Sequence, residues 1–469
     1  MMRENKLYDE LKVGDTASIK RVCTANDLYI FAHASGNLNP VHLPADDGDV
    51  HPEAIAPSMW VGALVSSVLG NILPGAGTLY KSQTFRFLDR VHVGDELTVT
   101  VTVREKAEDA RVVLDTSVTG RGGSRIAEGV AEVLAPARKV RVDADRLPDI
   151  LVESHRHFDR LLMAAESLEP LATAVVVPED KVSLGGALLA ARRGIIRPIL
   201  VGSAKTIAAV AKDIAADLKG IEIVDVADHD AAAAAAVELV HAGKAAAIMK
   251  GALHTDELLH HVVKRDGGLR TRRRLSHVFV MDVPGLDHLL IVSDAAINIA
   301  PDLDAKVDIT QSAIDVALAL GIELPKVGIL SAVETVNSKI PSTIDAAVLS
   351  KMAERGQIKG GTVDGPLAMD NAIDVEAART KGITSLVAGH ADILIVPNLE
   401  AGNMLAKELA FVAHAEGAGL ALGAAVPIIL TSRADGEKAR LASCAIAALY
   451  RAWQSGSLTR LTPIAEAAE

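Results

Sequence analysis

The arrangement of apolar and polar residues along the chain changes near position 140. Before it, three β-branched segments alternate apolar and polar residues with the period of two expected of half-buried strands: residues 97–103, 111–118 and 126–134. The segment 55–69 is instead apolar almost all round and begins with Pro57 and Ser58, which favours a helix enclosed by sheet. We therefore predict an α+β domain over residues 1–140, in which antiparallel sheet wraps around one central helix.

The period changes after residues 141–155, a charged and proline-containing segment that we predict to be a linker. From there to the carboxyl terminus, short apolar strands alternate with alanine-rich helical stretches. The predicted strands are 173–177, 197–202, 221–226, 245–249, 277–281, 288–292, 326–330, 392–397 and 427–430. This alternation is typical of a parallel α/β sheet with helices on both faces, in which functional loops follow the carboxyl ends of the strands.

Composition narrows the class of protein. Only 3% of the 469 residues are aromatic, and seven of those twelve lie in the first ninety positions, so we expect the two parts to have differently built cores. The net charge of −12 argues against binding to nucleic acid or to an anionic membrane. Cys23 and Cys444 are too few for a disulfide framework, and neither a signal segment nor an apolar membrane span is present. We therefore expect a cytoplasmic protein.

A turn-rich segment in the first part, FAHASGNLNPVH (31–42), carries candidate chemistry. By itself it predicts a turn, in which His42 is either a hydrogen-bonded turn residue or a functional one. Together with IAPSMW (55–60), residues 69–91 and GDELTVTVTV (94–103), it resembles the MaoC-like (R)-specific enoyl-CoA hydratases, which have the hot-dog fold.

That resemblance implies that His42 is the catalytic histidine of the hydratases and that Asn37 stands where they have an acid–base aspartate. It also implies that the backbone N–H at Ser58 binds the thioester oxygen of the substrate. Because an amide cannot accept a proton from water, we expect this domain to bind acyl-CoA with its hydratase activity weakened or lost.

In the second part, six polar segments end or follow predicted strands: 250–261, 269–282, 293–302, 364–373, 391–408 and 426–435. We expect them to converge in one cleft. Ser432 and Arg433 offer a hydroxyl and a guanidinium suited to a phosphoryl group. Arg270 is one of four arginines in LRTRRR (269–274), of which we expect one or two to face inward. Asp364 and Asp370 bracket a Gly-Pro turn, where Asp364 either serves as or orients a base, or only caps the turn.

From about residue 155 to 469, these segments resemble the phosphate acetyl/butyryltransferases, and LEAGNMLAK and SRAD are closest to the butyryltransferase branch. The resemblance implies an α/β two-lobed fold like that of isocitrate and isopropylmalate dehydrogenases, with lobe one over about 156–297 plus 422–469 and lobe two over about 298–421. It also implies a homodimer or higher homo-oligomer, and coenzyme A and acyl-CoA as substrates rather than bound cofactors. No metal is expected.

The resemblance assigns roles residue by residue. Ser432 and Arg433 match the Ser-Arg pair of the transferases, and Asp435 is the candidate base for the thiol of coenzyme A. The remaining candidates for substrate binding are Thr255, His260, His261, Arg270, Asp364, Asp370, Glu400 and Asn403. The histidines stand where acetyltransferases carry a phosphate-binding arginine, and their partial charge at neutral pH would hold phosphate less firmly.

We therefore predict a fused enzyme, in which an acyl-CoA-binding hot-dog domain precedes a phosphate acyltransferase that acts on acyl-CoA, phosphate and acyl phosphate. The alternative is that the second part senses acyl-CoA and supports assembly, with little catalysis.

Overall fold

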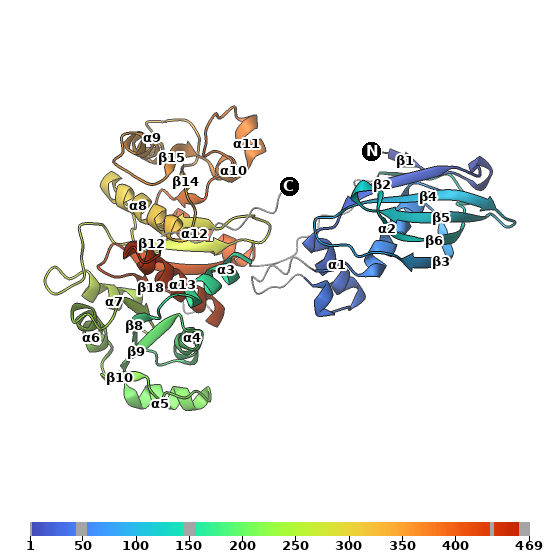
Figure 1. The fold of residues 1–469 in the computed structure, drawn as a ribbon. Coiled ribbons are helices and arrows are strands. Elements are labelled where there is room, and N and C mark those ends of the chain that lie inside the picture. Colours follow the sequence, from blue (N-terminus) through green and yellow to red (C-terminus); the bar gives the residue numbers. More distant parts are fainter. Residues whose placement is uncertain (1, 44–53, 144–155, 432–435, 459–469) are drawn as a thin grey trace. The chain divides into compact units, whose positions relative to one another are not determined.

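The computed structural model describes residues 2–43, 54–143, 156–431 and 436–458. The chain separates into two compact units, Met1–Val152 and Glu153–Glu469, and each is described by itself (Figure 1). Part of the predicted linker, residues 144–155, lies outside the described residues. Among the described helices, none has the length and apolar character needed to cross a membrane.

The first unit contains a five-stranded antiparallel sheet in the order β2-β4-β5-β6-β3, against which helix α2 packs. Its elements are β1 (Met2–Glu4), β2 (Thr16–Val22), α1 (Ala25–Ser35), α2 (Ser58–Asn71), β3 (Leu79–Phe87), β4 (Glu96–Lys106), β5 (Arg111–Thr119), β6 (Arg125–Leu134) and β7 (Arg141–Asp143), with short 3-10 turns at Tyr8–Glu10, Pro40–His42 and Arg121–Gly123. The buried residues of α2, among them Trp60, Val65 and Leu69, share one core with the inward-facing valines of β4. The predicted hot-dog arrangement of sheet around a central helix is confirmed.

The described part of the second unit forms one eleven-stranded sheet, in the order β10-β9-β8-β11-β18-β17-β12-β13-β16-β14-β15. Its strands are β8 (Leu171–Val176), β9 (Ile196–Gly202), β10 (Glu222–Asp225), β11 (Ala247–Lys250), β12 (Ser276–Asp282), β13 (Leu290–Ser293), β14 (Lys326–Leu330), β15 (Thr362–Leu367), β16 (Ile393–Ile395), β17 (Glu416–Leu422) and β18 (Ile428–Ile429). Its helices are α3 (Arg156–Glu166), α4 (Lys181–Arg192), α5 (Ala204–Asp213), α6 (His229–His241), α7 (Thr255–Val262), α8 (Leu303–Ala319), α9 (Pro341–Glu354), α10 (Met369–Ile373), α11 (Val375–Thr380), α12 (Leu399–Phe411) and α13 (Glu437–Gln454).

The expectation of a purely parallel sheet is wrong. β17 pairs antiparallel with both β12 and β18, and β12 pairs antiparallel with β13. The strands therefore form two sets: β8, β9, β10, β11, β12 and β18 run one way, and β13, β14, β15, β16 and β17 run the other way. Carboxyl ends of the two sets lie at opposite edges of the sheet, so the six polar segments cannot all meet at one edge.

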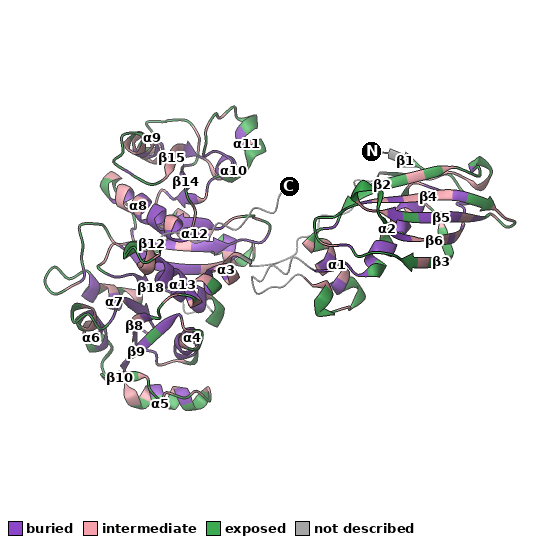
Figure 2. Cartoon of the chain, in the orientation of Figure 1, coloured by how far each residue is buried: buried purple, intermediate pink, exposed green. Residues whose placement is uncertain are grey.

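Helix α13 is largely buried within the second unit (Figure 2). Every residue from Arg440 to Tyr450 is buried, and the helix contacts α3, α4, α8 and β17. Six alanines in this helix leave little side chain between it and its neighbours, which lets the backbones approach closely. The core of this unit is accordingly aliphatic, with Phe158 and Tyr450 as its buried aromatic residues among those described.

Candidate functional site

The loop after α1 holds the two hot-dog candidates in a series of local hydrogen bonds. The helix ends at Gly36, whose φ of 71° is left-handed, a conformation that glycine adopts without strain. Asn37 Oδ1 then accepts a hydrogen bond from the Asn39 N–H at 3.2 Å. His42 Nδ1 lies 2.7 Å from the carbonyl oxygen of Ile55. Since a carbonyl oxygen only accepts, Nδ1 must carry the proton, and Nε2 of a neutral ring is then left as a proton acceptor.

Ser58 is the first residue of α2 and is exposed, with buried Pro57 before it. Its backbone N–H has no acceptor among the described residues, because the first amides of a helix lack intrahelical partners. This free N–H, together with the helix dipole, provides the donor that the sequence predicts for a thioester oxygen.

In the second unit, one edge of the sheet carries the carboxyl ends of β11 and β18. Lys250 ends β11, is 4% exposed, and donates through Nζ to the carbonyl oxygens of Gly251 and Leu253 at 3.3 and 3.2 Å. Thr255 begins α7 just beyond, half-buried. A buried lysine thus lies beside the start of this helix, which sequence reasoning missed although Lys250 opens one of the six segments.

The two histidines of α7 point in different directions. His260 is exposed. The ring of His261 is buried, with Nε2 2.6 Å from Asp230 Oδ1 and Nδ1 3.0 Å from Lys264 Nζ. The hydrogen bond from His261 lowers the pKa of Asp230. Both ring nitrogens of His261 are therefore used within the protein, so His261 ties α7 to α6 and has no nitrogen left for phosphate.

Thr431 follows β18 at the same edge and accepts a hydrogen bond from Arg440 Nη1 at 2.6 Å. Arg440, on α13, is 2% exposed, a second buried cation that the sequence did not single out. Its charge also reaches Asp180: burial raises the pKa of Asp180, but hydrogen bonds from Ser183 and the charge of Arg440 bring it below the ordinary value. Ser432, Arg433 and Asp435 lie outside the described residues.

The remaining acidic and amide candidates lie on β15 or on the helices α10 and α12, which follow β15 and β16. Asp364 lies within β15, the outermost strand of the sheet, and its Oδ1 accepts a hydrogen bond from the backbone N–H of the next residue at 2.8 Å. Asp370 is exposed and ion-paired with Lys381 at 3.0 Å, which lowers the pKa of Asp370. Glu400 is exposed in the first turn of α12, and Asn403 Nδ2 donates to the carbonyl oxygen of Ala295 at 3.3 Å. None of these four is brought next to Lys250 or Thr431 by the sheet order.

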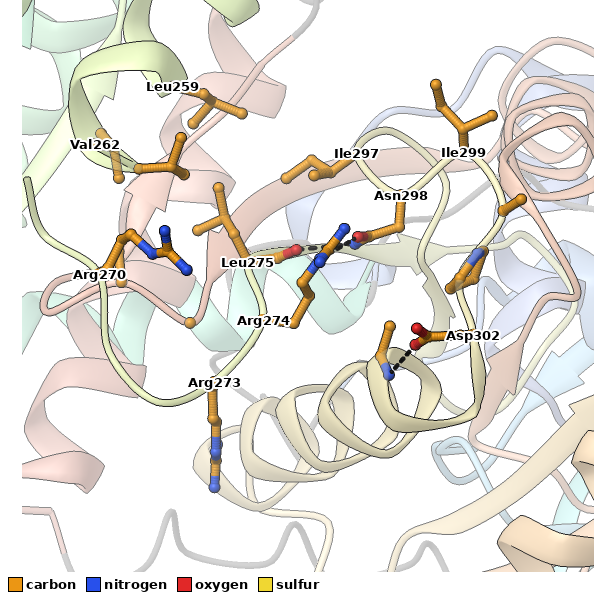
Figure 3. Close-up of a pocket in the computed structure, with 16 residues that line it drawn as sticks. Leu259, Val262, Arg270, Arg273, Arg274, Leu275, Ile297, Asn298, Ile299 and Asp302 are labelled. Atoms are coloured by element: carbon orange, nitrogen blue, oxygen red, sulfur yellow. Dashed lines mark hydrogen bonds between the residues drawn. The ribbon is translucent and has the colours of Figure 1, made fainter. Parts of the chain in front are cut away.

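Arg270 lines a pocket of about 640 Å³ (Figure 3). The bridge between Arg270 and Ala424 puts this pocket near the amino end of β18, whereas Thr431 follows the carboxyl end of that strand. The pocket is formed by the end of α7, the segment before β12, the loop after β13 and the turn between β17 and β18. Two of the six polar segments, 269–282 and 293–302, therefore meet here, and a third, 250–261, contributes the end of α7.

Comparisons with known proteins agree with the two-unit organisation. The family model "Phosphate acetyl/butaryl transferase" matches residues 229–448, and the model "MaoC like domain" matches residues 12–120. The sequence is 62% identical over 295 residues, 63% of this chain, to a phosphate acetyltransferase of Rhizobium meliloti, and covers 93% of that protein. It is 44% identical over 294 residues, 63% of this chain, to a phosphate butyryltransferase of Clostridium acetobutylicum, and covers 98% of it.

Among solved structures, a branched-chain phosphotransacylase from Enterococcus faecalis V583 matches with a TM-score of 0.51 and 29% identity, over 60% of this chain and 99% of that one. The fold and these matches define an α/β acyltransferase unit preceded by a MaoC-like hot-dog domain. The chain belongs to the phosphate acetyl/butyryltransferase family.

Proposed function

We propose that the second unit transfers a short acyl group between coenzyme A and phosphate. The observation that carries this proposal is the 62% identity to a phosphate acetyltransferase over 93% of that protein. In the reaction, a phosphate oxygen attacks the thioester carbonyl carbon, the carbon–sulfur bond breaks, and the leaving thiolate takes the proton that phosphate gives up. Acyl-CoA and phosphate thus become acyl phosphate and free coenzyme A.

We assign the reaction to the edge at the carboxyl ends of β11 and β18. Ser432 and Arg433 would bind the phosphoryl group and stabilise its developing charge, and Asp435 would exchange the proton with the thiol. The burial of Lys250 and Arg440 beside this edge supports this assignment, because charged N–H donors suit a phosphate.

The other candidates take lesser parts in this proposal. Thr255 stands at this edge, at the start of α7, and would contact phosphate or coenzyme A, whereas His260 lies in the last turn of the same helix. Asp364, Asp370, Glu400 and Asn403 belong to the other strand set and would reach substrate only across a cleft between two lobes. Arg270 is left out, since it lies at the amino end of β18.

Three further features of the proposal follow from family membership. We infer the two-lobed arrangement of isocitrate and isopropylmalate dehydrogenases, a homodimer or higher homo-oligomer, and a cytoplasmic location. The last is consistent with the absence of a membrane-crossing helix among the described residues.

For the first unit, we propose binding of acyl-CoA with little hydration. His42 Nε2 is available as a proton acceptor, and the free Ser58 N–H can donate to a thioester oxygen. Hydration also needs a group that delivers or removes the second proton, and the Asn37 amide does neither. A bound thioester would thus be held rather than converted.

An assay of acyl phosphate formation tests this proposal against its alternative, an acyl-CoA-sensing module with little transfer. Arg433→Ala and Ser432→Ala in the full-length chain should each reduce acyl phosphate formation from acetyl-CoA and butyryl-CoA by about 10²–10³-fold. Arg355→Ala, an exposed arginine at the end of α9, is the matched control and should keep the wild-type rate. Equal rates in all three variants would contradict the assignment, and no transfer by the wild-type protein would favour the sensing module.

A further inference from the structure

The pocket that contains Arg270 is separate from the edge assigned to acyl transfer. α7 begins with Thr255 at the carboxyl end of β11 and carries the chain back toward the amino end of β18, where Leu259 and Val262 line the pocket. An antiparallel bridge joins Arg270 to Ala424, and both residues line the pocket near the amino end of β18. A strand and a two-turn helix therefore separate this pocket from Thr255 and Thr431.

The pocket has an apolar side and a cationic side. Leu259, Val262, Leu275, Ile297 and Ile299 provide aliphatic surface, and no aromatic side chain is among the lining residues of this described part of the chain. Arg270, Arg273 and Arg274 provide three guanidinium groups against one lining carboxylate. That carboxylate, Asp302, caps α8 by accepting from the Ala305 N–H at 2.9 Å, so its charge is directed toward the helix. The lining suits an anion that carries an aliphatic portion.

Arg274 is held in place by a chain of hydrogen bonds that runs through the buried residues Asn298 and Asp294 (Figure 3). Its Nε donates to Asn298 Oδ1 at 3.0 Å, while Asn298 Nδ2 donates to Asp294 Oδ2 at 2.6 Å and to the Leu275 carbonyl oxygen at 2.8 Å. Asp294 is fixed in turn by the backbone N–H groups of Ala296 and Ile297 at 2.9 and 3.0 Å. Because Nδ2 can only donate, the oxygen of Asn298 has to face Arg274, and the guanidinium is positioned before any ligand arrives.

The three arginines differ in what they already bind. Arg273 is ion-paired with Asp315 and extends away from Asn298 in Figure 3. Arg274 uses Nε and keeps its two terminal nitrogens for other partners. Arg270 is exposed, has no ion pair among the described residues, and lies across Leu275 from Arg274 in the same view. Arg270 and Arg274 are therefore the two guanidinium groups available to one anion.

We infer that this pocket is a second ligand site, which binds a phosphate monoester with a short aliphatic body. Two guanidinium groups match the charge of a phosphate dianion and its three terminal oxygens better than that of a carboxylate. The wall from α7, Leu275 and Ile297 takes the hydrocarbon part, and the absence of an aromatic platform in the lining disfavours a nucleotide base. This inference does not depend on acyl transfer at the other edge.

The probe is n-butyl phosphate, which has no acyl group to transfer, titrated into the full-length protein by isothermal calorimetry. Arg433→Ala serves as the background, so that phosphate binding at the acyl-transfer edge does not contribute. We expect saturable binding, with an affinity that Arg270→Ala and Arg274→Ala each weaken about tenfold or more. The control is Arg272→Ala, an exposed neighbour outside the pocket lining, which should change the affinity less than twofold. Asn298→Ala should weaken binding as well, since it releases Arg274.

Further arms define the ligand class. Inorganic phosphate should bind more weakly than n-butyl phosphate if the aliphatic wall contributes, and pentanoate more weakly still if the dianion is required. Thermal unfolding of each variant shows that it is folded, and Arg270→Ala changes an exposed side chain only. No saturable heat with n-butyl phosphate, or equal affinity in the Arg270 and Arg272 variants, would overturn the inference. Tighter binding of pentanoate would show a carboxylate site instead.

Discussion

Gly251 directly follows β11, at the edge of the sheet that we assign to acyl transfer. We expect its substitution by alanine to displace the strand ends at that edge. The backbone N–H of Gly251 donates to the Val176 carbonyl oxygen at 2.8 Å, and that of Ala252 to the Val177 carbonyl oxygen at 2.7 Å. A Cβ at position 251 would lie 2.5 Å from the Val176 oxygen and 2.3 Å from the Val177 oxygen. Ordinary contacts begin near 3.4 Å, so the ends of β8 and β11 would have to separate by about 1 Å.

The expected loss of stability adds two contributions. Crowding of this kind costs about 1–3 kcal/mol, and the two stretched hydrogen bonds cost about 0.5–1.5 kcal/mol each. We expect Gly251→Ala to lower the free energy of unfolding by about 2–6 kcal/mol. Transfer should also slow, because Thr255 and the rest of α7 follow the displaced strand end.

Chemical denaturation of the full-length protein, with activity measured in parallel, tests this expectation. The control is Gly436→Ala, at the N-cap of α13, where an added Cβ has no described atom within 4 Å and the φ of −72° suits any residue. That variant should differ from the wild type by less than about 1 kcal/mol. If Gly251→Ala unfolds at the wild-type denaturant concentration, the close approach of β8 and β11 is not as described.

Three further outcomes are expected. Burial lowers the pKa of His277, and the nearby charge of Asp294 opposes this shift. Below a pH of about 6.5 the unfolded chain binds a proton that the folded ring resists, so the stability falls by at most about 1.4 kcal/mol per pH unit. Denaturation at pH 8 and pH 5 should therefore show the stability difference between wild type and His277→Gln shrinking at the lower pH. Asn37→Asp should raise hydration of crotonyl-CoA and His42→Ala should abolish that gain, whereas robust wild-type turnover would refute the role given to Asn37. Burial raises the pKa of Cys23 and of Cys444 to about 12, so iodoacetamide at pH 7.5 should label neither thiol until denaturant is added, as read by mass spectrometry.

The pattern of residues predicted much of the fold because burial sets the period of apolar positions. Every one of the nine predicted strands of the second unit corresponds to an observed strand. β15 and β17 were missed: TVDGPL and EGAGLAL contain glycines, and β15 a proline, that weaken the strand pattern. Strand direction was also missed, because an apolar strand has the same composition whichever way it runs. The antiparallel pairing of β17 is what divides the polar segments between two edges.

Candidate site residues were harder to predict, because their roles depend on contacts between distant parts of the chain. His261 looked like a phosphate ligand, yet it faces Asp230, which lies on another helix. Lys250 ends an apolar strand and Arg440 lies on an alanine-rich helix, and only the packing of α13 shows that Arg440 reaches Thr431. Ser432, Arg433 and Asp435 remain predictions from the sequence.

The most direct test of acyl transfer is the stoichiometry of thiol release from butyryl-CoA by the full-length protein, with and without phosphate. Thiol is measured with a disulfide reagent, and acyl phosphate is trapped as a hydroxamate in the same samples. Acyl transfer predicts release that depends on phosphate and yields one acyl phosphate for each thiol. Thiol release that is the same without phosphate and gives no hydroxamate would show hydrolysis of the thioester, and would contradict the assignment of the second unit.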